Sequence, residues 1–153
     1  MNKLMLFFSV LLSSSISADL KNDLEKQISP LMDKVIEWRH DIHQNPELSN
    51  REYRTARKIE AHLRSLDIKV QTKIAYTGVV GLIEGDLPGP TIALRADMDA
   101  LPVVEKTGLP FASKDKTKYL GQTVGIMHAC GHDAHVAILM GVAEFLAENK
   151  DRR

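Results

Sequence analysis

Three stretches of the chain place apolar residues at the spacing of helices that are buried on one side. The first begins at Pro30, which is tolerated at a first helical position, and ends before Pro46. The second follows residues 49–52, which read as a capping box, and the third opens near Asp133 as its N-cap. The apolar positions of the three helices are Leu31, Val35, Trp38 and Ile42; Ala56, Ile59, Leu63 and Leu66; and Val136, Leu139, Met140, Ala143 and Leu146.

Between the second and third helices the pattern changes to short runs bounded by glycine and proline. Residues 69–74 and 79–83 read as two strands, and residues 91–94 as a third strand after the turn at residues 85–90. Residues 103–127 look mostly irregular, and a loop of that length is usually functional. This order of elements predicts an α/β fold in which a sheet is covered by helices.

The first 18 residues differ in kind from the rest of the chain. Lys3 gives a basic start, residues 4–12 are almost entirely apolar, and residues 13–18 are small. This is the pattern of a secretory signal peptide, and the apolar run is about half of the roughly 20 residues that a spanning helix needs. We therefore expect residues 1–18 to be removed and the chain to be exported, to the periplasm or as a secreted protein, without a stable membrane span. An uncleaved anchor is the alternative.

Composition narrows the classes of function further. Lys plus Arg and Asp plus Glu both number 20 in 153 residues, so the net charge is zero and no nucleic-acid partner is expected. The single cysteine, Cys130, has no partner for an internal disulfide. It is either buried and inert or occupied, for example by a metal ion, and a redox thiol is a further alternative.

The densest group of chemically active residues is the stretch 128–135. Its potential metal-binding side chains are His128, Cys130, His132 and His135, together with Asp133. If residues 128–132 are extended, alternate side chains project to one side, and Gly131 lets the backbone bend between two ligands. The stretch precedes a helix N-terminus, which favours a thiolate, and thiolate and imidazole suit zinc, manganese, cobalt or nickel. Taken alone, Cys130 would be a small buried hydrophobe and His135 a helix-surface residue.

Two further groups of polar residues have open interpretations. Asp97 and Asp99 follow the predicted third strand, where both carboxylates face a site or one caps a turn, and Arg95 is able to pair with either. His43 and Glu47 lie at the end of the first helix, within reach of a site. Their spacing alone favours a solvated helix end.

Together these stretches resemble the metallo-amidohydrolases that include hippurate hydrolase, bacterial N-acyl-L-amino-acid amidohydrolases and the plant auxin-conjugate (IAA-amino acid) hydrolases. The matching segments are residues 39–52, 77–80, 93–105 and 125–141, in that order along the chain. The segments 95–102 and 128–135 are the specific ones.

The resemblance implies a zinc-peptidase-like catalytic domain, of which residues 19–153 are the N-terminal part. It implies two divalent metal ions, manganese or zinc, with cobalt and nickel as alternatives. Cys130 and His132 match metal ligands of the family motif, and Asp99 matches a supporting acidic residue. Asp97 stands where related peptidases carry a metal-binding histidine and is not taken as a ligand, while His135 is expected to give nearby support.

The activity that the resemblance implies is hydrolysis of the amide bond of N-acyl amino acids or related small-molecule conjugates. The general-base glutamate, further ligands and a lid domain used in dimerisation are expected beyond residue 153, so a homodimer is expected only of a full-length enzyme. Glu144 and Glu148 are interpreted as the solvated face of the last helix. A truncated, inactive chain that keeps part of a metal site is the alternative function.

Overall fold

The computed structural model describes residues 20–152, so the predicted signal peptide lies outside the described residues. The chain divides into two compact units, Met1–Met32 and Asp33–Arg153. In the described part of the first unit, residues 20–28 are helical and the 3₁₀ helix η1 (Ser29–Leu31) follows. No helix among residues 20–152 is long and apolar enough to cross a membrane.

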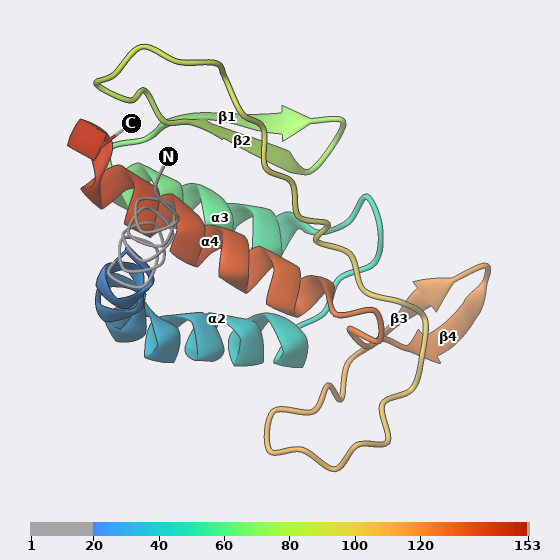
Figure 1. The fold of residues 1–153 in the computed structure, drawn as a ribbon. Helices are drawn as coiled ribbons and strands as arrows, with labels where there is room; N and C mark the ends of the chain where they lie inside the picture. The colour runs from blue at the N-terminus through green and yellow to red at the C-terminus, as the bar shows by residue number, and fades with distance from the viewer. Residues whose placement is uncertain (1–19, 153) are drawn as a thin grey trace, which may run out of the picture. The chain divides into compact units, whose positions relative to one another are not determined.

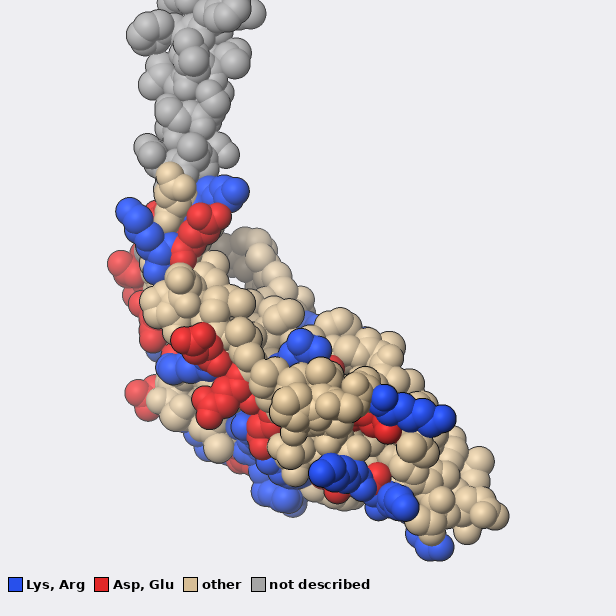
Figure 2. Space-filling model, turned by 90° about the horizontal axis from the view of Figure 1, so that it is seen from below, with Lys and Arg blue, Asp and Glu red and all other residues tan. Residues whose placement is uncertain are grey.

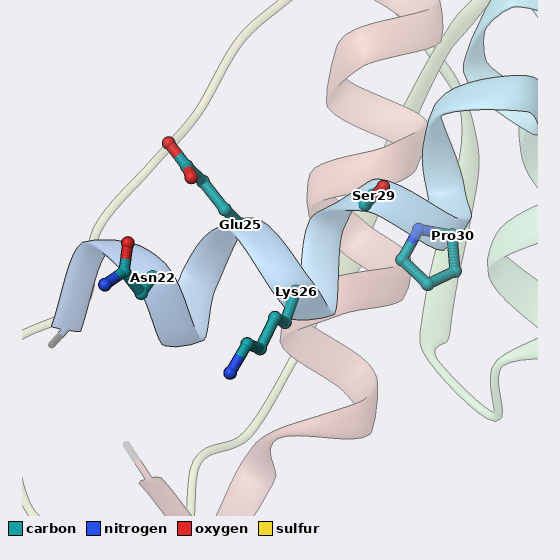
Figure 3. Close-up of a pocket in the computed structure, with 5 residues that line it drawn as sticks. All are labelled: Asn22, Glu25, Lys26, Ser29 and Pro30. Carbon is teal, nitrogen blue, oxygen red and sulfur yellow. The ribbon is translucent and has the colours of Figure 1, made fainter.

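The first unit carries a hollow of about 540 Å³. It is lined by Asn22, Glu25, Lys26, Ser29 and Pro30. Figure 3 shows Glu25 and Lys26 pointing to opposite sides of the helix. Because these side chains do not converge on one point, the hollow is not a candidate site.

The second unit is built around three helices that lie side by side (Figure 1). They are α2 (Met32–Gln44), α3 (Tyr53–Ser65) and α4 (His132–Glu148), and the short 3₁₀ helix η2 (Lys150–Arg152) follows α4. The three helices predicted from the apolar spacing are therefore confirmed. Their starts differ by one to three residues from the sequence expectation.

Helix α4 supplies side chains to both hydrophobic clusters of the second unit. In the first cluster, Val136 and Met140 of α4 pack against Ile42 of α2, which is fully buried. In the second cluster, Ala143 packs with residues of α3 and of the chain after it. Since α4 begins at His132, its burial fixes the position of the stretch that carries the candidate ligands.

Two strands form an antiparallel hairpin that α3 covers. Strands β1 (Lys69–Ile74) and β2 (Gly78–Leu82) pair from Lys69 opposite Leu82 onward. Leu63 of α3 packs with Val70 of β1 and Val79 of β2. The prediction of two strands covered by a helix is confirmed, and the sheet has two strands.

The third predicted strand, residues 91–94, does not form a strand in the structure. Ile92 is 79% exposed and Leu94 is 56% exposed, so this apolar run has no partner among the described residues that would complete a ladder. Figure 1 shows the chain after β2 running as an extended connection past the helices. Its end is anchored, because Ala96 and Met98 pack against the cluster around Ile42.

The long segment predicted to be irregular contains a second hairpin. Strands β3 (Lys116–Tyr119) and β4 (Gln122–Gly125) pair antiparallel across a two-residue turn. Leu120 and Gly121 in the turn both have positive φ, 48° and 78°, as a type I′ turn requires. Leucine rarely occupies a left-handed position, which is why the sequence concealed this turn.

The predicted capping box before α3 does not form. Glu52 occupies the N-cap position without a side-chain cap bond, and its carboxylate instead accepts a 2.6 Å hydrogen bond from the Thr77 hydroxyl. The cap comes from Glu47, whose two carboxylate oxygens accept 2.8 Å hydrogen bonds from the backbone N–H groups of Arg54 and Thr55. A carboxylate at this end also suits the helix dipole.

Acidic and basic side chains are mixed over the face of the described residues seen in Figure 2.

Glu144 is not on a solvated face as predicted, since it is 5% exposed. Lys34 of α2 donates to its Oε1 at 2.5 Å, so the carboxylate is buried as part of an ion pair. Glu148, in contrast, is exposed as expected.

Candidate metal centre

The stretch that carries the candidate ligands is bent, not extended. Gly131 has φ of +87°, a left-handed conformation that glycine adopts without strain, and it is the N-cap of α4. His128 is 4% exposed, whereas Cys130 is exposed. The expectation that His128, Cys130 and His132 project to one side is therefore wrong, because the helix already begins at His132.

His132 is held through one ring nitrogen. Its Nδ1 lies 2.9 Å from the backbone oxygen of Asp99 and 3.1 Å from the Asp99 carboxylate. Both groups are acceptors, so Nδ1 carries the proton and the lone pair is on Nε2. A histidine oriented in this way by a carboxylate is the usual form of a metal ligand, with the other nitrogen directed at the ion.

Asp97 and Asp99 have different partners. Arg95 donates to the Asp97 carboxylate, while Asp99 accepts from His132. The nearest approach of Asp97 to His132 is 4.0 Å, measured from a carboxylate oxygen to Nε2, which is beyond hydrogen-bond distance. Of the two open interpretations, Asp99 therefore supports His132 directly, and Asp97 lies on the side of the ring where the lone pair projects.

Backbone pairing brings Asp99 next to His132, which lies 33 positions away in the chain. The Ala100 N–H donates to the Glu47 carbonyl at 2.7 Å, and Leu101 and Met127 exchange hydrogen bonds of 2.9 and 3.0 Å. These contacts are isolated β-bridges and not part of a longer strand. No sequence pattern predicted these bridges, and they explain how the segments 95–102 and 128–135 meet.

The donor set fits a divalent transition metal. Cys130 is exposed with a free thiol, so the alternative that it is buried and inert is wrong. A thiolate and a neutral imidazole nitrogen are ligands that zinc accepts. The His135 ring lies 5.7 Å from the His132 ring, between centroids. Within residues 20–152, however, no three His, Cys, Asp or Glu side chains come together as a complete metal site.

His128 is buried without a hydrogen-bond partner. Neither of its ring nitrogens contacts a polar group in the described part of the chain. Burial disfavours the charged ring and lowers its pKa to about 4, so the imidazole is neutral near pH 7.

His43 is buried and the partly exposed Glu47 caps α3, so the solvated helix end that their spacing favoured is wrong for His43. His43 is 5% exposed and lies between two carboxylates, 2.9 Å from Asp133 and 3.1 Å from Glu105. Asp133 is 1% exposed and lies in the first turn of α4, so it is not the N-cap that the sequence suggested. Although burial alone raises the pKa of the Asp133 carboxyl, the hydrogen bond with His43 lowers it below its usual value.

Glu105 is a residue that sequence reasoning missed. Its side chain is fully buried, but it sits in an irregular stretch without periodicity. Two sequence features reached this position: it closes the matching segment 93–105, and it lies in the long loop.

Comparison with protein families places the second half of the chain. Residues 93–153 match the model described as Peptidase family M20/M25/M40. The match contains both Asp99 and the stretch 128–135 and so covers the candidate centre. The resemblance predicted from the sequence is confirmed.

Similar proteins cover most of the chain. It is 48% identical to thermostable carboxypeptidase 2 of Saccharolobus solfataricus, over 87% of this chain and 32% of that protein. It is 37% identical to the N-acyl-L-amino acid amidohydrolase of Geobacillus stearothermophilus, over 86% of this chain and 33% of that protein. The chain thus spans about a third of the length of these curated relatives.

A solved structure agrees with the fold. The YxeP protein of Bacillus subtilis, described as a dinuclear metal binding peptidase from the M20 family, matches with a TM-score of 0.70 and 41% identity. The match covers 80% of this chain and 32% of that one. The predicted α/β fold of peptidase type is confirmed over the matched part.

Proposed function

We propose that this chain belongs to a metal-dependent amidohydrolase that cleaves the amide bond of N-acyl amino acids. The match of residues 93–153 to the model of Peptidase family M20/M25/M40 supports this proposal. Two relatives are named for such chemistry, the N-acyl-L-amino acid amidohydrolase and the N-acetyl-L-cysteine deacetylase of Bacillus subtilis. The observation that carries the proposal is the His132 ring, whose Nδ1 is fixed by Asp99 and whose Nε2 is left to bind an ion.

The residues of this chain divide into ligands and supports. Cys130 and His132 would hold the metal, and Asp99 orients His132. Asp97 and His135 would be supporting residues, because both lie beside the His132 ring. Two divalent ions, manganese or zinc, would supply polarisation of the amide carbonyl and a lowered pKa for the attacking water. No residue among 20–152 is assigned as the general base.

A small hollow beside Asp99 suits a small-molecule substrate. Its volume is about 180 Å³, and Arg51, Leu101 and Tyr119 are among its lining residues. A guanidinium group is a bidentate partner for a carboxylate, which N-acyl amino acids carry. Asp99 both lines this hollow and contacts the candidate ligand His132, so a substrate in the hollow would lie next to the proposed centre.

The test is hydrolysis of hippurate and N-acetyl amino acids by the full product of the gene, with and without a chelator. We expect activity to disappear with chelator and to return with Mn²⁺ or Zn²⁺. His132→Ala and Cys130→Ser should each lower kcat/KM by at least about 100-fold, since even residues that only orient a ligand are worth 10- to 100-fold. Activity that survives metal removal would overturn the proposal.

One observation favours a second candidate, a chain that binds metal weakly and does not catalyse. Within the described residues no three potential ligands assemble, and a closed site needs about four. Calorimetric titration with Zn²⁺ distinguishes the two candidates. Tight binding of two ions per chain would exclude the second candidate, whereas weak binding without hydrolysis would support it.

We further propose export of the chain, supported by the basic, apolar and small-residue pattern of residues 1–18. Expression in a host with its own secretion machinery, followed by N-terminal sequencing, tests this. Cleavage near residue 18 is expected. A cytoplasmic product that retains Met1 would contradict it.

A further inference from the structure

His43 is a buried link between two acidic side chains. Its Nδ1 lies 2.9 Å from Oδ2 of Asp133, and its Nε2 lies 3.1 Å from Oε1 of Glu105. All three side chains are almost completely buried, with at most 6% of any side chain exposed. The ring thus places one nitrogen within hydrogen-bond distance of each carboxylate.

The link joins three parts of the chain. His43 lies in the last turn of α2, Asp133 lies in the first turn of α4, and Glu105 belongs to the irregular segment before β3. Glu105 in turn organises that segment, because its Oε2 accepts the Ser113 N–H at 2.5 Å. The aromatic ring of Phe111 meets His43 edge-on at 5.4 Å between centroids.

Asp133 directly follows the candidate ligand His132. Fixing Asp133 therefore fixes the first turn of α4, which begins where the left-handed Gly131 ends the preceding stretch. The His132 side chain is held from elsewhere by Asp99. The backbone of His132 and its ring are thus held by separate contacts. His43 helps to hold the backbone, through Asp133, and Asp99 holds the ring.

Removing His43 would break the link between Glu105 and Asp133, the residue that follows the candidate ligand His132. Arg39 also contacts Asp133, with Nε 3.3 Å from the same Oδ2, but the Arg39 side chain is 47% exposed. It does not reach Glu105 in any contact of the described residues. Among the described residues, only His43 contacts both acids. Without it each carboxylate loses one partner but keeps another, Arg39 for Asp133 and the Thr107 hydroxyl for Glu105, and the link between the two segments is lost.

We infer that His43 is a positioning residue for the metal centre: by bridging Asp133 and Glu105 it fixes the first turn of α4, and with it His132, in the geometry that binds the ion. This inference rests on the proposed function. It concerns the affinity and the coordination geometry of the ion, and it assigns His43 no contact with substrate.

The experiment uses the full product of the gene and compares His43→Gln with His40→Gln. His40 is a matched control, because it lies on the same helix and stacks on Phe111 at 3.8 Å, and within the described part of the chain it hydrogen-bonds to neither acid. Zn²⁺ affinity is measured by calorimetry, and the d–d absorption of bound Co²⁺ reports coordination geometry. Thermal unfolding of the metal-free proteins separates folding from metal binding.

We expect His43→Gln to weaken Zn²⁺ binding by about 10- to 100-fold and to shift the Co²⁺ bands, with His40→Gln within about threefold of wild type. If His43→Gln does not fold, Glu105→Gln replaces it, because it removes one bridging charge at nearly constant volume; about tenfold weaker binding is expected.

Two outcomes overturn the inference in different ways. A folded His43→Gln or Glu105→Gln protein with wild-type affinity and wild-type Co²⁺ bands overturns the positioning role alone. A wild-type protein that binds neither ion overturns the proposed function and the positioning role together.

Discussion

His132 and Asp133 are neighbours in sequence, yet they lie in two regions with opposite character. Asp133 belongs to a buried region in which His43 and Arg39 both hydrogen-bond to its carboxylate. His132 belongs to the region of the exposed Cys130. The Asp97 carboxylate lies 4.0 Å from Nε2 of His132, beyond hydrogen-bond distance. The first region has its hydrogen bonds filled within the fold, and the second keeps ligand atoms available.

The difference separates structural histidines from candidate ligands by what surrounds them. His43 has partners at both nitrogens and is buried, so the fold uses all of its bonding capacity. His132 has partners at one nitrogen only, and those partners select the tautomer that a metal needs. Composition could not make this distinction, since both are histidines in polar stretches.

The largest expected effect contrasts Asp133→Ala with Cys130→Ala. Asp133→Ala should lower the free energy of unfolding by about 3–5 kcal/mol, because it leaves His43 buried without one of its partners. Cys130→Ala in the metal-free protein should change it by less than about 0.5 kcal/mol, because the thiol is exposed. Urea unfolding with chelator present measures both, and equal losses would erase the contrast.

The next effect is a pH dependence at His128. Burial lowers the pKa of His128 to about 4 from its ordinary 6.5, so the unfolded chain binds the proton more tightly. Its contribution to stability is fully present above pH 6.5 and is lost as the pH falls toward 4, up to about 3 kcal/mol. Unfolding free energies of wild type and His128→Gln across this range should therefore converge on acidification. Parallel curves would count against a buried neutral ring.

A smaller effect is expected at the support of the candidate ligand. Asp99→Ala removes the carboxylate contact to His132 Nδ1 and leaves only the backbone oxygen. We expect Zn²⁺ affinity to fall by about 10- to 100-fold in calorimetric titration. Asp97→Ala is the comparison, since Asp97 makes no hydrogen bond to His132, and an equal loss there would mean that Asp97 is itself a ligand.

The smallest effect tests a capping carboxylate outside the ligand region. Glu47→Ala leaves two backbone N–H groups at the start of α3 without acceptors and should cost about 1–2 kcal/mol of stability. Metal affinity should not change. Hydrogen exchange of the Arg54 and Thr55 amides would localise the loss, and unchanged protection there would show that water replaces the cap.

The sequence by itself determined the helices, the two strands that form the first hairpin and the residue types of the candidate centre. The apolar spacing placed α2, α3 and α4 because each buries one face, and a period of 3.6 residues is readable without a structure. The specific segments 95–102 and 128–135 indicated the resemblance, which the family match over residues 93–153 confirmed.

Tertiary structure decided which polar groups meet. The pairing of His132 with Asp99 spans 33 residues and that of His43 with Asp133 spans 90, and no local pattern encodes such contacts. The missing third strand has the same cause, since a strand exists only where a partner completes its hydrogen bonds, and residues 91–94 have no such partner in the described part of the chain. Long-range contacts of this kind depend on how the helices pack, which is why only the folded chain distinguishes His43 from His132.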